Sequence, residues 1–211
     1  MKLDPKDLST AALYRFMTGV VVPRPIAFVS TVGTGGRFNV APFSYFNAIT
    51  SRPPLISISV GSREGGMKDT LRNLRATPDF VVNIVDEPLL ARAVQASGDW
   101  PEEVSEFDLT GLTPVPSERV KSPRVAESPV NLECRLEREI ALGEAVLVVG
   151  EIVFAHADER VLTEGRVDIA KLRPAGRLGG DGYSIVRDVI QFPRPRAERA
   201  AGPGGAKAAE G

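Results

Sequence analysis

A two-residue alternation of apolar and polar side chains runs through the middle of the chain. In residues 55–60 two isoleucines and a valine share one face, and two serines point the other way. Residues 130–138 alternate in the same manner, with valine, leucine and cysteine opposite asparagine, glutamate and arginine. This period is typical of strands with one buried face, so both segments are predicted to lie in a sheet.

Three further segments favour strands. Residues 80–85 are almost continuously apolar, as in a buried central strand. Residues 145–156 are rich in β-branched side chains, with Gly150 as the expected bend or bulge. Residues 26–32 lead into a Gly-Thr-Gly-Gly turn, which predicts a hairpin. Its second arm is expected to break at Pro42, because proline cannot donate to a ladder, giving an edge, bulge or irregular crossing.

Helical spacing of apolar residues is confined to short segments. It occurs in residues 9–19, 67–76 and 86–98. From residue 99 to residue 128 prolines recur without a sustained period, which predicts a long irregular functional or interface loop. The helices are too few and too short to cover both faces of a parallel sheet, so we expect a mainly β fold, an antiparallel barrel or sandwich.

Composition narrows the function classes. The 211 residues are 43% hydrophobic and 25% charged, with 26 Lys+Arg against 27 Asp+Glu. This near-neutral balance predicts no nucleic-acid partner and no anionic membrane surface. One cysteine and one histidine exclude a disulfide framework and a multi-Cys or His-rich metal site, so no metal is expected. No run spans a bilayer and the N-terminus lacks a signal-peptide pattern, which predicts a cytoplasmic location.

The chain is expected to form one domain with a tail. Residues 1–192 carry all the periodic segments. Residues 193–211 consist of alanine, glycine, proline and charged residues with almost no apolar side chain. That composition predicts a disordered or loosely held tail.

Four stretches resemble the flavin reductase-like family, the FMN-binding split barrels that include flavoredoxins and the reductase partners of flavin monooxygenases. They are residues 24–31 (RPIAFVST), 39–47 (NVAPFSYFN), 68–70 (KDT) and 150–156 (GEIVFAH), and residues 177–180 (RLGG) and Tyr183 add to the similarity. The resemblance implies an FMN-binding split β-barrel with a few short helices, and a homodimer.

The same resemblance implies an oxidoreductase that passes reducing equivalents from NAD(P)H through bound FMN to free flavin, oxygen or a partner protein. The alternative is an electron carrier of the flavoredoxin type, whose donor is another redox protein. A third possibility is a non-redox module that holds another planar cofactor, such as haem or deazaflavin. Haem would need an axial ligand, and His156 is the one histidine available.

Lys68, Asp69 and Thr70 stand where a helix is expected to begin after a Gly-rich loop. A helix N-terminus offers unpaired N–H groups, and the lysine and threonine add a cation and a hydroxyl. We therefore expect the flavin phosphate here. Asp69 has the wrong sign and is expected to cap the helix or pair with Lys68. The alternative is an ordinary capped surface helix.

The segment from Asn39 to Asn47 is predicted to meet the flavin ring. A ladder broken at Ala41 and Pro42 would free backbone groups for the polar edge of the ring. The further cofactor-binding candidates of this segment are Asn39, Phe43, Ser44 and Asn47. Alternatively, the segment is a bulge at a sheet edge whose aromatic residues fill the core and a dimer interface.

Small hydroxyls on strands are the next candidates. Ser30, Thr31 and Ser59 could bind the ribityl chain while letting a planar ring approach, or they could simply line a solvated strand face.

Three residues near the C-terminal end complete the predicted site. The resemblance places His156 near the nicotinamide side of the flavin, as the one catalytic candidate, although a histidine beside apolar neighbours is more often packed and hydrogen-bonded. Arg177 and Tyr183 could cover the open flavin face or bind a nucleotide phosphate, or they could form a flap against a partner subunit.

Overall fold

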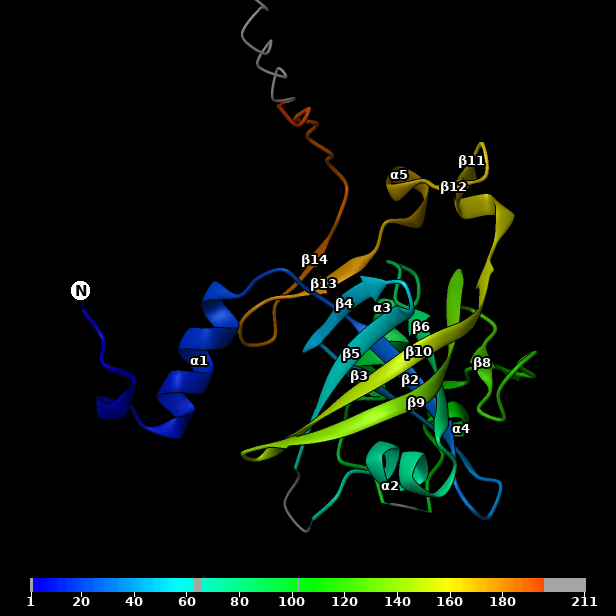
Figure 1. The fold of residues 1–211 in the computed structure, drawn as a ribbon, viewed down its shortest axis with the longest axis horizontal. Helices are drawn as coiled ribbons and strands as arrows, with labels where there is room; N and C mark the ends of the chain where they lie inside the picture. The colour runs from blue at the N-terminus through cyan, green and yellow to red at the C-terminus, as the bar shows by residue number, and fades with distance from the viewer. Residues whose placement is uncertain (1, 63–65, 102, 196–211) are drawn as a thin grey trace, which may run out of the picture.

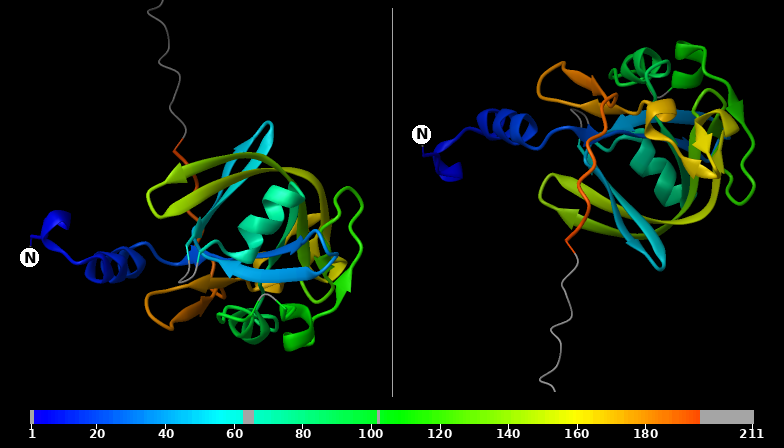
Figure 2. Two further views of the ribbon diagram at one scale, coloured as in Figure 1. Left: turned by 90° about the horizontal axis from the view of Figure 1, so that it is seen from below. Right: turned by 90° about the horizontal axis from the view of Figure 1, so that it is seen from above.

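Seven antiparallel strands form the main sheet of the computed structural model, which describes residues 2–62, 66–101 and 103–195. Their order is β3-β2-β6-β9-β10-β5-β4, and the sheet curls around helix α2 (Figure 2). The strands are β2 (Ala27–Val32), β3 (Phe38–Phe43), β4 (Phe46–Ser51), β5 (Pro54–Gly61), β6 (Asp79–Ile84), β9 (Val130–Leu142) and β10 (Ala145–Ala157). This confirms the predicted mainly β barrel with short helices.

Smaller elements surround the barrel (Figure 1). A three-stranded sheet joins β1 (Arg24–Pro25), β13 (Ala175–Arg177) and β14 (Tyr183–Ile185). Two short pairs are β7 (Pro114–Val115) with β8 (Arg124–Val125), and β11 (Leu162–Thr163) with β12 (Arg166–Val167). The helices are α1 (Thr10–Val20), α2 (Asp69–Ala76), α3 (Leu90–Gln95), α4 (Glu106–Thr110) and α5 (Ile169–Leu172), with 3-10 turns at Pro5–Asp7 and Glu159–Val161.

Helix α2 closes one end of the barrel because Leu71 and Leu74 pack into the barrel interior with Phe80 of β6. A β-carbon on Gly150 would lie 2.4 Å from the Phe80 ring, so glycine is required there. The β9–β10 register shifts between Val149 and Gly150, which confirms the predicted bulge. Outside the barrel, α3 and α4 contribute to a second apolar cluster against β2 and β3.

Strand β3 does not break at Pro42. The β2–β3 ladder keeps one register from Phe38 to Phe43, with Pro42 opposite Phe28. The predicted break is therefore wrong, whereas the predicted edge position is correct, because β3 lies at one end of the strand order. At an edge, the position that lacks an N–H can face away from the neighbouring strand, and the ladder continues past it.

Residues 112–128 carry two short strands but are otherwise irregular, and side chains of β6 hold them against the barrel. The Val125 amide donates to Asn83 of β6 at 2.9 Å, and the Ser122 amide donates to Asp79 at 3.0 Å. Side chains thus supply partners for backbone groups that a regular ladder would otherwise pair. The predicted irregular loop from residue 99 also contains helix α4.

Helix α1 projects away from the barrel (Figures 1 and 2). Ser9 caps it, as predicted, and accepts a hydrogen bond from the Ala12 amide at 3.2 Å. Thr18 is its one buried residue, and Tyr14 and Val20 are 62% and 60% exposed. The helix therefore presents apolar side chains that its own chain does not cover.

Of the predicted loose tail, Pro193, Arg194 and Pro195 are exposed, and the other positions lie outside the described residues. Among the helices that the structure describes, none is long and apolar enough to cross a membrane.

Candidate functional site

The outer edge of β3 exposes backbone groups beside α2. The Val40 amide donates to a Glu106 carboxyl oxygen at 3.2 Å, and the Ser105 hydroxyl donates to the Phe38 carbonyl at 2.8 Å. Because backbone direction alternates along an antiparallel strand, Phe38, Val40 and Pro42 all direct their polar groups away from β2. The carbonyls of Val40 and Pro42 therefore face this edge.

A narrow cavity of about 60 Å³ lies along that edge. Its lining comes from β3, from the first turn of α2 and from residues 96–106: Asn39, Ala41, Pro42, Lys68, Asp69, Thr70, Ala96, Ser97, Gly98, Asp99, Trp100 and Glu106. Six of the predicted cofactor-binding residues thus meet at one place. The volume is about twice that of a water molecule, roughly 30 Å³, so it suits a small polar group rather than a tricyclic ring.

Lys68 supplies positive charge at this narrow cavity. It is the N-cap residue of α2, and its ammonium lies 5.6 Å from the centroid of the Phe43 ring. It forms no ion pair with any residue in the described part of the chain. The helix dipole adds to the positive potential at the same end. Asp69 forms an ion pair with Arg72 one turn further along the helix.

A buried polar network holds β3, α2 and α4 together around Asn39. The Asn39 side-chain oxygen accepts from the Thr31 and Thr70 hydroxyls at 3.3 and 3.1 Å. Its amide nitrogen donates to both Glu106 carboxyl oxygens, at 3.0 and 2.9 Å. Burial raises the pKa of Glu106, so this carboxyl keeps its proton to a higher pH than an exposed glutamate. Thr31 and Thr70 are thus already engaged with the protein.

A second, largely apolar cavity of about 440 Å³ follows where β3 ends. Its lining joins the end of α1 to the β3–β4 corner: Met17, Val21, Pro23, Arg24, Pro25, Ser44, Tyr45, Phe46 and Asn47. It therefore contains two more predicted residues, Ser44 and Asn47. We call the two cavities together the β3 groove, because Phe43, which contacts Lys68, lies between their linings.

Arg24 is the fixed cation of the apolar cavity. The buried guanidinium donates to the Thr18 and Val21 carbonyls at 2.8 Å, to the Leu178 carbonyl at 3.0 Å and to the Ser44 hydroxyl at 3.3 Å. Four hydrogen bonds tie α1, the corner after β3 and the Arg-Leu-Gly-Gly segment to one side chain. Sequence reasoning missed this role, because nothing in a Pro-Arg-Pro pattern shows that the arginine is buried.

Arg177 and Tyr183 lie beside this cavity without lining it. The Arg177 guanidinium stands 4.4 Å from the centroid of the Tyr183 ring and donates to the Gly180 carbonyl at 2.6 Å. Their link to the cavity is the Leu178 carbonyl, which accepts from Arg24.

Three predicted residues lie apart from the β3 groove. Ser30 is 0% exposed and donates to the Pro123 carbonyl at 2.5 Å, so its hydroxyl faces the 112–128 segment. Ser59 lies on the face of β5 opposite the buried Ile58 and Val60 and lines none of the described cavities. His156 is near the end of β10, where it also lines none of them.

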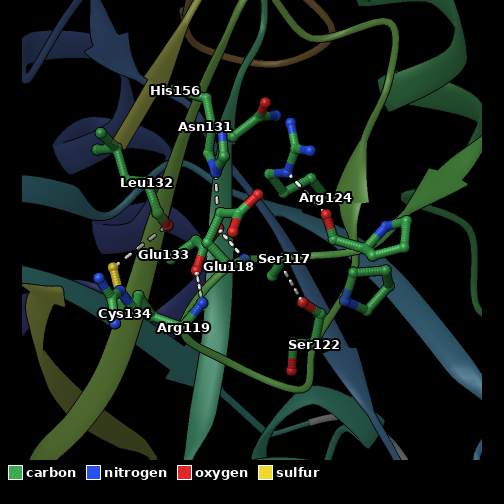
Figure 3. A network of polar contacts seen from close by, with 12 residues as sticks. Ser117, Glu118, Arg119, Ser122, Arg124, Asn131, Leu132, Glu133, Cys134 and His156 are labelled. Atoms are coloured by element: carbon green, nitrogen blue, oxygen red, sulfur yellow. Dashed lines mark hydrogen bonds and ion pairs between the residues drawn. The ribbon is translucent and has the colours of Figure 1, made fainter. Parts of the chain in front are cut away.

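His156 belongs to a separate polar network (Figure 3). Its Nε2 atom is 2.6 Å from a carboxyl oxygen of Glu133, which is 0% exposed and also accepts from the Glu118 and Arg119 amides at 2.8 and 2.7 Å. Burial of Glu133 opposes its ionisation, but the hydrogen bonds from Glu118, His156 and Arg119 outweigh it and lower the Glu133 pKa.

Glu106 is the other residue that sequence reasoning missed. It stands in the segment predicted to be irregular, and no local pattern relates it to Asn39. Among the described residues, no group of three or more histidine, cysteine, aspartate or glutamate side chains could hold a metal ion. Cys134 is buried in the barrel core, and burial raises the pKa of its thiol, which keeps it unreactive.

Comparisons with known proteins agree with this architecture. The chain is similar to nitrilotriacetate monooxygenase component B from Bacillus cereus, at 36% identity and a TM-score of 0.88 over 91% of this chain and 98% of that one. It is similar to Pseudomonas fluorescens 2-nitrobenzoate 2-nitroreductase at 34% identity and a TM-score of 0.86, over 96% and 100%. Flavoredoxin of Desulfovibrio vulgaris (Miyazaki F) matches at 26% identity and a TM-score of 0.76, over 91% and 97%.

A match to a family model agrees with these structural similarities. Residues 17–171 match the family described as the flavin reductase like domain, and this range includes the whole barrel and the β3 groove. The four sequence stretches, the barrel and these structural neighbours all agree. The chain therefore belongs to the flavin reductase-like family.

Proposed function

We propose that the protein is an FMN-binding oxidoreductase that passes reducing equivalents from NAD(P)H through the flavin to free flavin, oxygen or a partner protein. The observation that carries the proposal is the β3 groove, which has a cationic end at Lys68 and an apolar cavity between Ser44 and Asn47. FMN has the matching parts, an anionic phosphate and a flat, largely apolar ring with one polar edge.

The narrow end suits a phosphate. Lys68 and the N-terminus of α2 provide a charge and a dipole that attract an anion. Three carboxyl groups line the same cavity: Asp69 is paired with Arg72, the pKa of Glu106 is raised, and Asp99 is exposed to solvent. We therefore place the phosphate against Lys68 and the helix N-terminus, away from Asp99. Thr70 contributes by fixing Asn39, since its hydroxyl already donates there.

The wide end suits the ring. Apolar side chains supply most of its walls, while Ser44, Asn47 and Arg24 add polar groups to the lining. Bound FMN would supply the redox chemistry, accepting a hydride from the nicotinamide. The chain would position the ring and exclude water, and this task needs no general acid or base from the protein.

We further propose that two copies of the chain complete this site. One wall of the wide cavity is the end of α1, whose exposed apolar residues include Tyr14, Phe16 and Val20. Exposed Tyr45, just before edge strand β4, and exposed Ile49 within β4 add to this surface. A second copy packed on this surface would bury these side chains and close the cavity. His156 lines neither cavity, so a catalytic role for it requires that it approach the groove from that second copy.

The proposal is tested by mixing the FMN-loaded protein with NADH or with NADPH under nitrogen and following the visible flavin absorption. We expect rapid bleaching with at least one nucleotide. Absence of reaction with both, together with reduction by a redox protein, would favour the flavoredoxin type of carrier. Electron acceptors should include nitrobenzoates, because one similar protein is named as a nitroreductase.

The haem alternative has its own test. The Nε2 atom of His156 is held by Glu133, so this nitrogen is occupied by a protein partner. We expect a His156→Ala variant to keep the visible spectrum that the unaltered protein shows as purified, whereas loss of a haem spectrum in that variant would support an axial histidine.

A further inference from the structure

Arg24 is a buried charge without a counter-charge. Its side chain is 5% exposed and forms no ion pair in the part of the chain that the structure describes. Its hydrogen-bond partners there are three backbone carbonyls and the Ser44 hydroxyl, all of them neutral. Carbonyl dipoles lower the cost of burying a guanidinium, but they do not cancel its charge.

This charge belongs to the wall of the apolar cavity. Of the described residues that line this cavity of about 440 Å³, only Arg24 is charged at neutral pH. The Tyr45 ring lies beside the guanidinium, with 5.9 Å from its centroid to the guanidinium carbon, and most of the other lining side chains are apolar. Apolar walls screen a charge far less than water does, so a positive potential extends into the cavity.

Ser44 adds a hydrogen-bond donor to the same wall. Its hydroxyl oxygen accepts from Nε of Arg24 at 3.3 Å, and the hydroxyl donates no hydrogen bond to any described residue. Its proton is therefore available to an acceptor inside the cavity. A positive charge and a donor, with no carboxylate in the lining, favour an anion over a neutral ligand of the same shape.

Resting on the proposed function, we infer that Arg24 raises the redox potential of the flavin by stabilising the reduced, negatively charged ring. A nicotinamide that gives up a hydride loses two electrons and one proton and becomes a cation. The ring gains those two electrons and that proton, and with them one unit of negative charge. The oxidised ring is neutral, so the charge of Arg24 acts mainly on the reduced form. Arg24 thus sets the potential without transferring electrons or protons itself.

Two replacements separate this electrostatic effect from the structural ties of Arg24. Arg24→Gln keeps a hydrogen-bonding side chain but removes the charge. Arg24→Lys keeps the charge but loses the planar fork that donates to the three carbonyls. Arg166→Gln, on exposed strand β12 and outside the cavity lining, is the control for loss of an arginine.

Each protein is loaded with FMN and studied by two measurements. Calorimetry gives the dissociation constant of oxidised FMN, and an anaerobic titration of the visible spectrum against a redox dye gives the midpoint potential of the bound flavin. We expect Arg24→Gln to weaken reduced FMN at least about tenfold more than oxidised FMN, because charges a few ångströms apart interact by more than this in a protein. A tenfold change in that ratio lowers the potential by about 30 mV for a two-electron couple.

Arg24→Lys and Arg166→Gln should change the same ratio by less than about twofold. Ser44→Ala, which leaves the three carbonyl bonds of Arg24 in place, should lower the potential by about threefold in the ratio, because donors bind charged acceptors more strongly. This variant decides the matter if Arg24→Gln does not fold, and an unchanged ratio would then overturn the inference.

Equal losses for oxidised and reduced FMN in Arg24→Gln would overturn the inference while the proposed function stands. A potential that falls as far in Arg24→Lys would do the same, because Arg24 would then act through its structural ties alone. Failure of the unaltered protein to bind FMN would instead refute the proposed function, and this inference with it.

Discussion

At the scale of single residues, Lys68 supplies the positive charge of the proposed phosphate site. Its ammonium lies over the Phe43 ring at the first turn of α2, where a phosphate would meet both the charge and the helix dipole. Thr70, predicted beside it as a ligand, is 1% exposed and donates to Asn39. The sequence shows which residue types stand together, but it does not show which of them already bond to the protein.

We therefore predict that Lys68→Ala weakens FMN binding about tenfold or more, because hydrogen bonds to charged groups are among the strongest. Riboflavin, which has no phosphate, should bind the variant and the unaltered protein equally, as measured by calorimetry. Lys171→Ala, on α5, is the control. Equal losses for FMN and riboflavin would show that Lys68 does not contact the phosphate.

Glu133 gives a prediction about pH. Its pKa is lowered in the folded protein from the usual glutamate value of 4.5, so the folded state favours the ionised form. This stabilisation is fully present above about pH 4.5 and is lost as the pH falls through the folded-state pKa.

We expect Glu133→Gln to lower the free energy of unfolding at pH 7 by about 1–3 kcal/mol. The difference from the unaltered protein should shrink below about pH 4.5, as followed by urea unfolding at several pH values. Glu137→Gln, which changes a carboxylate 44% exposed, should behave like the unaltered protein. A difference independent of pH would contradict the assigned role of the charge.

At the scale of elements, periodicity predicted the strands whose two faces differ. Residues 55–60 and 130–138 alternate because one face packs in the barrel. Strand β4, from Phe46 to Ser51, escaped prediction because five of its six residues are exposed and no buried face marks it. The helix expected from residue 86 begins only at Leu90, since Asp86 accepts from the Leu89 amide in a preceding turn.

Local sequence patterns predicted only part of the functional site for the same reason, because they do not show burial by distant residues. The groups around the β3 groove were predictable where they follow one another along the chain, as at Lys68 and Thr70. Ser30 was misplaced because the residues covering its strand face come from the 112–128 segment, about 90 positions later. Burial by residues so distant along the chain cannot be predicted from the local pattern of apolar and polar residues.

Asn83 of β6 holds the 112–128 segment against the barrel. It accepts from the Val125 amide at 2.9 Å and the Asn131 side chain at 2.8 Å, and it donates to the Phe28 carbonyl at 2.8 Å. We predict that Asn83→Ala destabilises the protein by about 2–4 kcal/mol, because several buried groups lose their partner.

Amide hydrogen exchange at Val125 should rise in the Asn83→Ala variant well above the rise at barrel strands. Ser117→Ala removes one partly buried hydrogen bond of the same segment and serves as the control. Unchanged exchange at Val125 would mean that Asn83 does not hold the segment.

At the scale of the whole molecule, exposed apolar side chains on α1 and β4 predict a dimer in solution. Phe16→Glu combined with Val20→Glu places charges on the exposed surface of α1 and should give a monomer by sedimentation velocity. Val167→Glu, at an exposed apolar position on β12, is the matched control and should remain dimeric. A monomeric unaltered protein with full flavin affinity would contradict the claim that two copies complete the site.

The central claim is that the β3 groove binds a flavin. The most direct measurement is a titration of the unaltered protein with FMN, followed by the change in the visible flavin spectrum. The account predicts saturable binding at one FMN per chain, weakened in Lys68→Ala. A protein that neither carries flavin on purification nor takes up FMN at any concentration would contradict it.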